Sequence, residues 1–573
     1  MSVSISTLAE LLLDRAAKTP NARAVLQKLR GKWSETTWQG YAQAVAEVAQ
    51  GLDAIGIGGG DKVLIIVDNR PAFAYLDLAT QTIGAVSVPV APVTLYADVS
   101  RLIVSLKPSA VVVQDVEWVE LVLRDVGPSC KIIHVDTAGI SAYQDERLVA
   151  YQGIRESGAK SAKAVEFLRS RAKVLQPDGI ATMSISSGTH GILNSFSFTT
   201  RQVTESARVV ASRFPLAKGQ LVLSHAPLSA AAERSLTLYS AILTGAVVAF
   251  PENSTVADTA TTEIEPHFVR IPSAALDQLA SVSFRRLQRN KGLKKLVVRG
   301  LLRAIKSDST SSTLGNAFVA RFILRQFGLR RCGIVVVSNA AVNGSTRRFL
   351  KALGLATLDT YTSSGCLVPI MISESLGKAY GEIFEGVEVG ISPAGQVRVR
   401  GSLVSASALR SSGWHETNDH GISENGVVSV LGPKTFGNSV SRVRVLEEAV
   451  SSSQFIERAV VIGLGDGLNG LFIEIDPQAL SSWARLEDIS FTTLSAVLDD
   501  RRAQELLVGE VSAAAAPLSL LSYIHTVIIG RRSLTVDAGE LTVTGKVRSQ
   551  IVALRGEDIR LRLSEFTASP GSS

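Results

Sequence analysis

Cysteine is scarce in this chain of 573 residues, and the three that occur, Cys130, Cys332 and Cys366, are far apart. No two of them have the Cys-x-x-Cys spacing of a metal site or a redox pair. The sequence therefore argues against structural zinc, and it favours a reducing cytosol as the compartment.

Long apolar runs are also missing. No run approaches the roughly 18 residues that a membrane-spanning helix needs, and the longest candidates, such as residues 241–250, have the length of a buried strand. Residues 1–18 carry acids and bases within their first apolar stretch, so we do not expect a signal peptide. We expect a soluble, cytoplasmic protein.

A large excess of charge of one sign is also absent. The net charge is only +7 at pH 7, and the pI is near 9.2. A charge of this size suits a nucleotide, a coenzyme or an acidic lipid surface as well as nucleic acid. The sequence has no basic stripe interleaved with aromatics and no helix–turn–helix pattern, so we do not expect nucleic acid as a partner. With 46% hydrophobic and 19% charged residues, the composition is typical of a well-buried globular protein.

What the chain does contain is an alternation of strand-like and helix-like segments from residue 40 to about 360. Short Val, Ile and Leu runs occupy residues 62–67, 85–92, 110–113, 131–135, 220–224, 245–250 and 333–338. The stretches between them, such as 70–85 and 343–354, repeat apolar residues at i, i+3 and i+4. This alternation predicts an α/β fold of layered subdomains with largely parallel sheets.

The pattern changes in the last third of the chain. Residues 381–401 begin a series of strands and glycine turns, which predicts a small antiparallel or barrel-like β region. A separate unit with its own helix, strand, hairpin and further helices begins near residue 433. The sequence thus predicts a large N-terminal domain over 1–432, a small α+β C-terminal domain over 433–565 and a disordered tail over 566–573.

One segment is distinctive in charge. Residues 284–306 carry nine Lys and Arg and no acid. Such a run is most often a solvated basic helix or linker. The alternative is a peripheral contact with an anionic membrane through an apolar stripe, for which the candidate residues are Leu293, Leu296, Val297, Leu301 and Leu302.

Residues 184–201 read SISSGTHGILNSFSFTTR, a Ser/Thr/Gly cluster between an apolar run and a polar stretch of helical pattern. Loops of this composition cradle phosphate because backbone N–H groups and short hydroxyls wrap the anion while a nearby lysine neutralises it. Here no lysine or arginine stands between Gly188 and Thr200. The pattern indicates either a nucleotide loop without its cation or only a turn.

Five blocks of the chain together resemble the adenylate-forming (AMP-binding) superfamily, in particular the long-chain acyl-CoA synthetases. The blocks are residues 52–93, 223–253, 338–365, 412–434 and 455–463. Their order and spacing follow the family from about residue 5 to 560. The resemblance implies that an acyl carboxylate attacks the α-phosphate of ATP, pyrophosphate leaves, and a thiol such as CoA takes the acyl group. It also makes 1–432 an AMP-binding-like domain and 433–565 a lid-like domain.

The family's phosphate loop runs approximately TSGTTGxPKG, and this chain keeps its small residues but not its cation. The matching residues are Ser186, Ser187, Gly188, Thr189 and Gly191. The replaced ones are His190 for threonine, Leu193 for proline, Asn194 for lysine and Ser195 for glycine. An asparagine donates only neutral hydrogen bonds, and charged ones are about twice as strong. The resemblance therefore implies a nucleotide loop that has lost its point charge.

The family's metal-binding motif, YGxTE, is altered in the same direction. Tyr361 and Ser364 match it, but Gly365 stands where a glutamate would give an oxygen to Mg²⁺. Glu374 follows nine residues later, with nothing in the sequence to argue that it substitutes. Ala230 likewise replaces a histidine that is usual near the acyl pocket.

Two further positions do match the family. Asp419 in WHETNDHG corresponds to the aspartate that holds the ribose hydroxyls, although alone it would indicate only a turn. Lys546 corresponds to the C-terminal catalytic lysine that bridges acyl carboxylate and phosphate during adenylation; the alternative is an exposed lysine in a basic segment. Pro433 replaces the arginine of the family's GRKKD motif, and the hinge stretch 436–445 is several residues short.

Two functions from different classes remain open. The first is an active ATP-dependent ligase that forms an acyl-adenylate and passes the acyl group to CoA or a carrier-protein thiol. The second is a pseudoenzyme of fatty-acid metabolism that binds an acyl chain, a nucleotide or an active paralogue. The lost lysine, glutamate and arginine all act on phosphate, metal or nucleotide, so we favour the second. We expect weakened ATP or AMP binding, and the replacements put ordinary Mg²⁺ and CoA sites in question.

Overall fold

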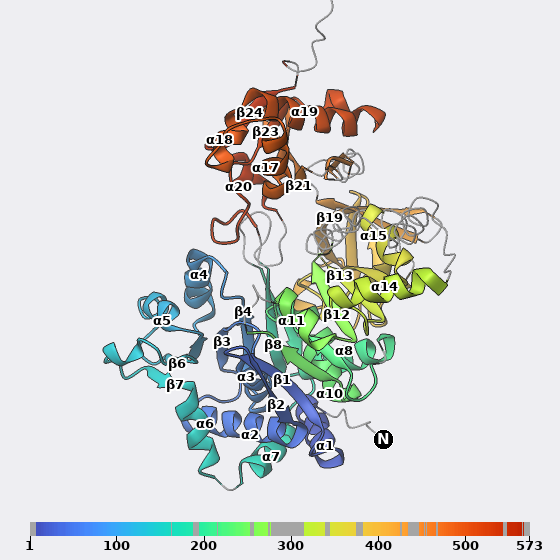
Figure 1. The fold of residues 1–573 in the computed structure, drawn as a ribbon. Coiled ribbons are helices and arrows are strands. Elements are labelled where there is room, and N and C mark those ends of the chain that lie inside the picture. Colours follow the sequence, from blue (N-terminus) through green and yellow to red (C-terminus); the bar gives the residue numbers. More distant parts are fainter. Residues whose placement is uncertain are drawn as a thin grey trace, which may run out of the picture.

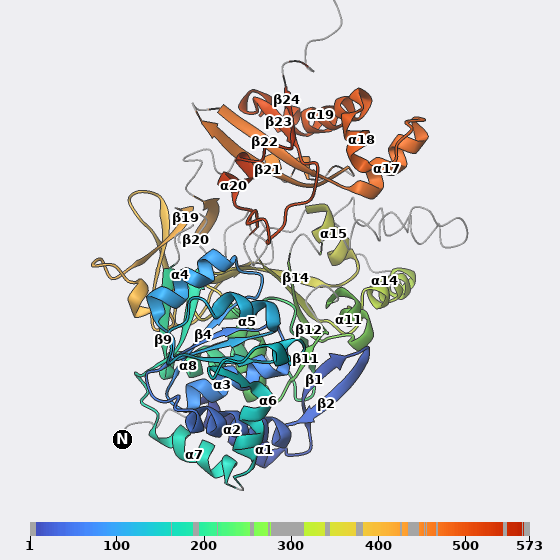
Figure 2. The ribbon, with the colours of Figure 1, turned by 90° about the vertical axis from the view of Figure 1, so that its left-hand side faces the viewer.

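The structure is a computed structural model, shown in Figure 1 and, turned by 90°, in Figure 2. It describes residues 7–161, 163–186, 194–214, 216–252, 257–272, 276, 314–338, 344–373, 382–424, 427–433, 446–447, 449–451, 453, 455–465, 468–518, 520–541, 547–563 and 565. The basic segment 284–306, the hinge stretch 436–445 and the tail 566–573 lie outside the described residues.

A seven-stranded sheet with the strand order β7-β6-β5-β3-β4-β8-β9 forms the first layer. Its strands are β3 (Lys62–Ile66), β4 (Val86–Val90), β5 (Ala110–Val113), β6 (Lys131–His134), β7 (Leu148–Ala150), β8 (Ile180–Ser186) and β9 (Asn194–Thr199). All neighbouring strands are parallel except β8 and β9. The four apolar runs between residues 62 and 135 were predicted as strands, and the structure confirms them.

Helices cover both faces of this sheet. They are α2 (Trp38–Ala54), α3 (Pro71–Thr82), α4 (Tyr96–Leu106), α5 (Val116–Val122), α6 (Tyr151–Ala159) and α7 (Ala164–Val174). One face packs on α4 and α5 through residues such as Leu102 and Val119, and the other joins the large central core through residues such as Val45 and Phe73. Burial of both faces explains why these strands are continuous apolar runs without alternation.

The second layer is a nine-stranded sheet with the order β16-β15-β14-β13-β12-β10-β11-β1-β2. Its strands are β1 (Arg23–Leu29), β2 (Lys32–Thr37), β10 (Leu221–Leu223), β11 (Val247–Phe250), β12 (Phe268–Pro272), β13 (Ile334–Ser338), β14 (Ala356–Tyr361), β15 (Met371–Ser373) and β16 (Glu382–Ile383). The centre is parallel, and β2, β15 and β16 are antiparallel to their neighbours.

Helices also cover the second sheet. They are α1 (Leu8–Lys18), α8 (Thr200–Arg213), α9 (Ala231–Arg234), a π-helical turn (Ser235–Tyr239), α10 (Ser240–Thr244), α11 (Ala257–Ile264), α14 (Leu314–Gln326) and α15 (Gly344–Ala352). Residues of α11, α14 and α15 form a core of their own against one face. The other face shares the central core with the first sheet, so the two sheets form one packed body.

A small antiparallel sheet follows, with the order β17-β18-β19-β20. Its strands are β17 (Glu388–Ile391), β18 (Gln396–Arg400), β19 (His415–Glu424) and β20 (Val427–Pro433). Val397 and Val399 of β18 belong to the central core, which attaches this sheet to the body of the molecule. The structure thus confirms the predicted small β region after residue 381.

The C-terminal unit has a separate core. Its sheet has the order β21-β22-β23-β24, built from β21 (Ile456–Gly465), β22 (Leu468–Ile475), β23 (Thr526–Ile529) and β24 (Ile559–Arg562). Its helices are α17 (Pro477–Leu486), α18 (Leu494–Asp499), α19 (Arg501–Ala515) and α20 (Ser549–Ala553). The main buried cluster runs from Leu446 to Leu563 and contains no residue of the preceding sheets. Figures 1 and 2 both show this unit, in orange and red, at one end of the molecule.

The predicted fold class is confirmed: a large N-terminal part of layered α/β subdomains with a small β region, followed by a small α+β unit. β20 ends at Pro433, and the boundary at 432/433 stays a prediction.

Candidate nucleotide site

The Ser/Thr/Gly loop connects two strands that pair with each other. Ser186, the last residue of β8, pairs with Asn194, the first residue of β9. Ser187, Gly188, Thr189 and Gly191, together with His190 and Leu193, lie outside the described residues, so their predicted role as a phosphate cradle stays a prediction. Asn194 and Ser195 are exposed, and the replacement of a family lysine by Asn194 stays a prediction.

The helix after this hairpin begins at a well-capped position. Thr199 is the N-cap of α8: its side chain accepts from the backbone N–H of Gln202, and its own N–H donates to the Gln202 side chain. The Gln202 amide also donates to the backbone carbonyls of Ser402, at 2.8 Å, and Val404, at 3.0 Å. This capping box therefore fixes the start of α8 and ties it to the segment that leads to β19.

Tyr361 and Asp419 are brought together from two different sheets. Tyr361 ends β14 and Asp419 lies on β19, and the Tyr361 hydroxyl donates to Oδ2 of Asp419 at 2.8 Å. The same hydroxyl lies 3.1 Å from Oγ1 of Thr417, which in turn donates to the carbonyl of Val397 at 2.8 Å. Tyr361 and Thr417 are buried, with 8% and 5% exposure, and Asp419 is half-buried.

The half-buried Asp419 carboxylate thus lies beside a buried pair of hydroxyl groups. A carboxylate has two oxygens with about four lone-pair sites, so one hydrogen bond from Tyr361 leaves acceptor capacity for a diol. Two predicted nucleotide residues, far apart in sequence, thus share one site, and their binding of nucleotide stays a prediction.

Ser364 and Gly365 follow β14 in a turn. Ser364 is half-buried and Gly365 is buried. The Gly365 carbonyl accepts from the backbone N–H of Ser405 at 2.9 Å, so this turn is held against the loop that precedes β19. Ser364 lies three residues after Tyr361 and thus near the pair formed with Asp419, and its predicted nucleotide contact stays a prediction.

His415, the first residue of β19, lies beside this turn. Its Nε2 lies 3.3 Å from Oγ of Ser363, and its ring packs edge-on against Phe196 of β9 at a centroid distance of 5.4 Å. Burial lowers the pKa of His415, so the imidazole is neutral near pH 7. Sequence reasoning did not single out His415, although its place in the block WHETNDHG was a signal that could have prompted it.

The chemistry of these residues does not fit a Mg²⁺ site of the family type. A hard cation needs oxygen ligands at fixed distance, and Gly365 has no side chain. Among the residues that the structure describes, no group of three or more His, Cys, Asp or Glu side chains could hold a metal. Glu374 lies outside the described residues.

A buried polar network underlies the loop that contains Ala230. Arg234 has no exposed surface, and its guanidinium donates to the carbonyls of Leu228 at 3.0 Å and Ser229 at 3.2 Å. The Asn69 amide donates to the carbonyl of Ala226 at 2.7 Å and accepts from the N–H of Leu228 at 3.1 Å. The loop before α9 is therefore held from two sides.

The same network reaches other elements through side chains. Arg234 donates to the Tyr239 hydroxyl at 3.0 Å, which donates to Asp77 of α3 at 2.7 Å, while Glu233 pairs with Arg270 of β12. Sequence reasoning missed these residues. The signal that could have found them was the pair of charges at 233–234 inside an otherwise apolar helical stretch.

In the C-terminal unit, the segment around Lys546 is bracketed by described residues, while Lys546 itself lies outside them. Leu541 and Val547 form an antiparallel bridge, and the N–H of Arg548 donates to the Glu540 carbonyl at 2.7 Å. A Cβ at Gly539 would lie 3.2 Å from Leu95, just before α4. The loop that leads to Lys546 therefore faces the N-terminal part of the molecule.

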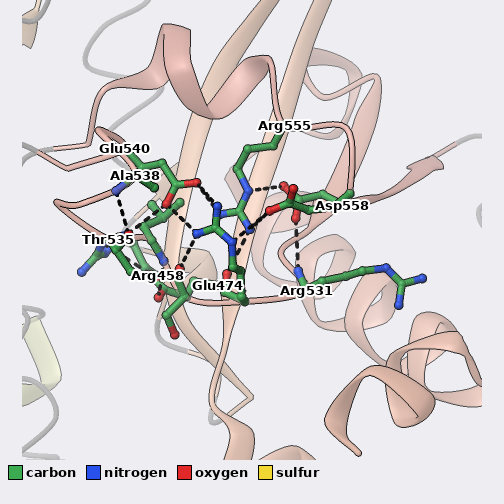
Figure 3. Close-up of polar contacts among 12 residues, drawn as sticks. Arg458, Glu474, Arg531, Thr535, Ala538, Glu540, Arg555 and Asp558 are labelled. Carbon is green, nitrogen blue, oxygen red and sulfur yellow. Dashed lines mark hydrogen bonds and ion pairs between the residues drawn. The ribbon is translucent and has the colours of Figure 1, made fainter. Parts of the chain in front are cut away.

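Figure 3 shows the ionic network that anchors this loop. Glu540, with 2% exposure, accepts two hydrogen bonds from Arg532, at 2.9 and 2.8 Å, and one from the backbone N–H of Thr535 at 3.0 Å. Arg555 lies 3.4 Å from Glu540 and 3.0 Å from Asp558. Although burial alone raises the pKa of Glu540, these bonds and charges hold it below its ordinary value.

No helix among the described residues is long and apolar enough to cross a membrane. The predicted contact of residues 284–306 with an anionic membrane falls outside those residues, and it stays a prediction.

Comparison with known proteins places this geometry in context. A family model described as AMP-binding enzyme matches residues 12–401. The chain is 24% identical to the long-chain-fatty-acid–CoA ligase FadD15 of Mycobacterium tuberculosis over 95% of each chain. It is 22% identical to the peroxisomal long chain acyl-CoA synthetase 7 of Arabidopsis thaliana, over 94% of this chain and 83% of that one.

Solved structures of similar fold cover nearly the whole chain. The O-succinylbenzoate coenzyme A synthetase of Bacillus subtilis, in complex with AMP, gives a TM-score of 0.65 at 14% identity and covers 94% of this chain and 97% of its own. The A domain of a carboxylic acid reductase from Segniliparus rugosus, in complex with AMP and a carboxylic acid, gives a TM-score of 0.70 at 14% identity, covering 95% and 92%. At these identities the likeness establishes the fold.

Proposed function

Because this chain belongs to the AMP-binding enzyme family, whose model matches residues 12–401, we propose that it is a degenerate acyl-CoA synthetase-like protein. It binds an acyl chain, a nucleotide or both, and it is impaired in adenylation. The observation that carries the proposal is Gly365: the position that would give an oxygen to Mg²⁺ is a buried glycine packed beside His415.

The proposal rests on a difference between the two ends of the site. One end has groups that suit a nucleoside, and the other lacks the groups that would act on phosphate and metal. At one end, Tyr361 and Asp419 form a hydrogen-bonded pair that leaves acceptors for a ribose diol. At the other end, Asn194 is an exposed neutral amide and Gly365 offers no ligand. Binding of a nucleoside relies on the first end, whereas displacement of pyrophosphate relies on the second.

The size of the expected impairment follows from electrostatics. The transition state of adenylation gathers charge on phosphate oxygens, and removal of one preorganised donor lowers the rate by about 10²–10³. The lysine and the glutamate of the family motifs are both replaced, and Pro433 stands in place of an arginine. The effects of such losses on the rate are not additive, but all of them fall on the same step, adenylation. Lys546 would still bridge the acyl carboxylate and the phosphate as negative charge shifts during adenylation.

The acyl chain is the ligand that these replacements leave unaffected. An apolar tunnel needs only size and hydrophobicity, and Ala230 is smaller than the histidine it replaces. CoA binding is put in question because the family's coenzyme face forms around the hinge, which is shortened here at 436–445. An active paralogue is a further proposed partner, and the basic residues 284–306 are the proposed contact with an anionic membrane.

The alternative is an active ATP-dependent long-chain fatty acid ligase that works through an acyl-adenylate, with CoA or a carrier-protein thiol as acceptor. The observation in its favour is the 24% identity to the fatty-acid ligase FadD15 over 95% of the chain. Lys546, at the place of the family's catalytic lysine, also suits this activity.

ATP–pyrophosphate exchange with a panel of fatty acids, run beside calorimetric binding of ATP and AMP, separates the two. The proposal predicts nucleotide binding with little or no exchange for any chain length. Robust exchange that Lys546→Ala abolishes would establish the ligase instead.

A further inference from the structure

A side chain at Gly365 would press tightly against its neighbours in this structure. A Cβ built on it would lie 3.0 Å from Nε2 and 3.1 Å from Cδ2 of His415, and 3.5 Å from Cβ of Ala408. Real Cβ atoms rarely approach other atoms so closely. The backbone at Gly365 does not have the positive φ that favours glycine, so the crowding at this position comes from the neighbouring imidazole.

The imidazole is held in place by contacts from three other segments. Its Nε2 lies 3.3 Å from the Ser363 hydroxyl, the backbone of Ala408 hydrogen-bonds to the ring, and Phe196 packs against it edge-on at 67°. These segments are themselves joined, because the Ser405 hydroxyl donates to the carbonyl of Ser197 at 2.8 Å and the N–H of Ser197 donates to Ser407 at 3.1 Å. A shift of His415 away from Gly365 would therefore alter these contacts.

The charges around this imidazole do not replace a metal-binding carboxylate. Arg410 and Glu416 are the charged groups that act on the ring, with opposite effects on its pKa. A neutral imidazole gives at most one nitrogen lone pair, and here Nε2 already faces Ser363. Hard cations take oxygen ligands, so the ring fills the space without supplying the ligand.

We infer that Gly365 and His415 are one coupled pair, and that His415 determines specificity by filling the space that a carboxylate side chain at position 365 would need. This inference rests on the proposed function and specifies the ligand of the site. That ligand is a nucleoside monophosphate bound without a divalent cation, in preference to Mg·ATP. A monophosphate carries less charge to neutralise than a triphosphate, which suits a site with a neutral Asn194 and no metal ligand at 365.

The coupling has a direct consequence for attempts to restore adenylation. Gly365→Glu alone adds a Cβ 3.0 Å from Nε2 of His415, so the imidazole or the turn must shift to admit the side chain. Restoration requires His415→Ala in the same chain, which opens the space beside position 365.

The test is a double-mutant cycle on the full chain with Gly365→Glu, His415→Ala and their combination. Thermal unfolding without ligand is measured first. Overpacking destabilises folded proteins, and we expect Gly365→Glu alone to lower Tm by roughly 2–4 °C or more, with a much smaller loss in the His415→Ala background. Gly333→Glu is the matched control, because a Cβ there meets nothing within 4 Å and its φ is not positive.

Equal losses of Tm from Gly365→Glu in both backgrounds would overturn the coupling. Should Gly365→Glu give no folded protein, Gly365→Ala asks the same question, because its methyl group already lies 3.0 Å from Nε2.

Calorimetry with AMP and with ATP, each with and without Mg²⁺, then tests the specificity. We expect the unmodified protein to bind AMP more tightly than ATP and equally well with and without Mg²⁺, and the double variant to gain Mg²⁺-dependent ATP binding by about tenfold. Mg²⁺-dependent ATP binding by the unmodified protein would overturn this specificity. The unfolding result does not depend on any ligand, so it is distinct from failure of the proposed function, which pyrophosphate exchange reports.

Discussion

The hydrogen bond between Tyr361 and Asp419 joins the nine-stranded sheet to the small antiparallel sheet at the proposed ribose site. Tyr361 is buried and donates to Oδ2 at 2.8 Å. This bond orients the carboxylate, so in the proposed site Tyr361 positions the group and Asp419 binds the ribose. Their different roles lead to different expectations for their variants.

We predict that Tyr361→Phe weakens AMP binding several-fold while the protein stays folded, because the carboxylate loses its orienting donor but keeps its acceptors. The lost hydrogen bond lowers the free energy of unfolding by about 0.5–1.5 kcal/mol. Asp419→Asn should weaken AMP binding more, since it removes an acceptor for the diol. Calorimetry measures both, and unchanged AMP affinity in Asp419→Asn would contradict the ribose role.

At the scale of elements, the loop that leads to Lys546 depends on a charge network at the end of the C-terminal sheet (Figure 3). The Arg555 side chain is 4% exposed and is shared by Glu540, Glu557 and Asp558. Its guanidinium also lies 5.5 Å from the centre of the Phe472 ring. Removing it leaves the fully buried Asp558 carboxylate without this cation, and Glu540 keeps only Arg532.

We predict that Arg555→Met lowers the free energy of unfolding of the C-terminal unit by about 3–5 kcal/mol, as for other buried pairs that lose one partner. Arg501→Met is the control in the same unit, because its pair with Glu505 is exposed and such pairs contribute at most about 1 kcal/mol. Denaturant unfolding measures both, and equal effects would contradict the importance of the network.

The acid dependence of this network follows from the pKa of Glu540, which lies below its ordinary value. A lowered carboxyl pKa contributes stability above the unfolded value of about 4.3, and that stability is lost as pH falls through the folded pKa. Burial raises the pKa of Asp558, which works in the opposite direction. In Glu540→Gln, the free energy of unfolding should therefore fall less steeply as the pH drops below about 4.3. An equally steep fall in the variant and the unmodified protein would contradict this account.

How much could be predicted differs between elements and site. Strands such as 110–113 were predictable because burial on both faces demands a continuous apolar run, and the Asp419 and Tyr361 positions followed from the family motifs. The contact of His415 with Gly365 was not predictable, because it joins residues 50 positions apart through the packing of two sheets. The Arg234 network was missed for the same reason: its partners on α3, β8 and the π-helical turn are brought together only by the tertiary fold.

At the scale of the whole molecule, the N-terminal part and the C-terminal unit have separate cores. The connection between them falls at residues 434–445, and Pro433 fixes the backbone φ at its start. We expect the short connection to restrict rotation of the C-terminal unit.

We predict that limited trypsin digestion cuts in the connection, at Lys434, Arg442 or Arg444, and releases a stable C-terminal fragment. Chain segments between separately folded domains are common sites of proteolytic cleavage. Digestion that never cuts in the connection, or that degrades the C-terminal unit without a stable fragment, would contradict the two-domain organisation.

The central claim, that adenylation is impaired because the phosphate and metal end of the site has lost its charges, is tested most directly by acyl-AMP formation. The purified protein is compared with a variant carrying Asn194→Lys, Gly365→Glu and His415→Ala, each with Mg·ATP and long-chain fatty acids. We predict little or no acyl-AMP from the unmodified protein and a rise of about tenfold or more in the variant, in line with the effect of single electrostatic groups on such steps. Robust acyl-AMP formation by the unmodified protein, abolished by Lys546→Ala, would contradict the account and establish an active ligase.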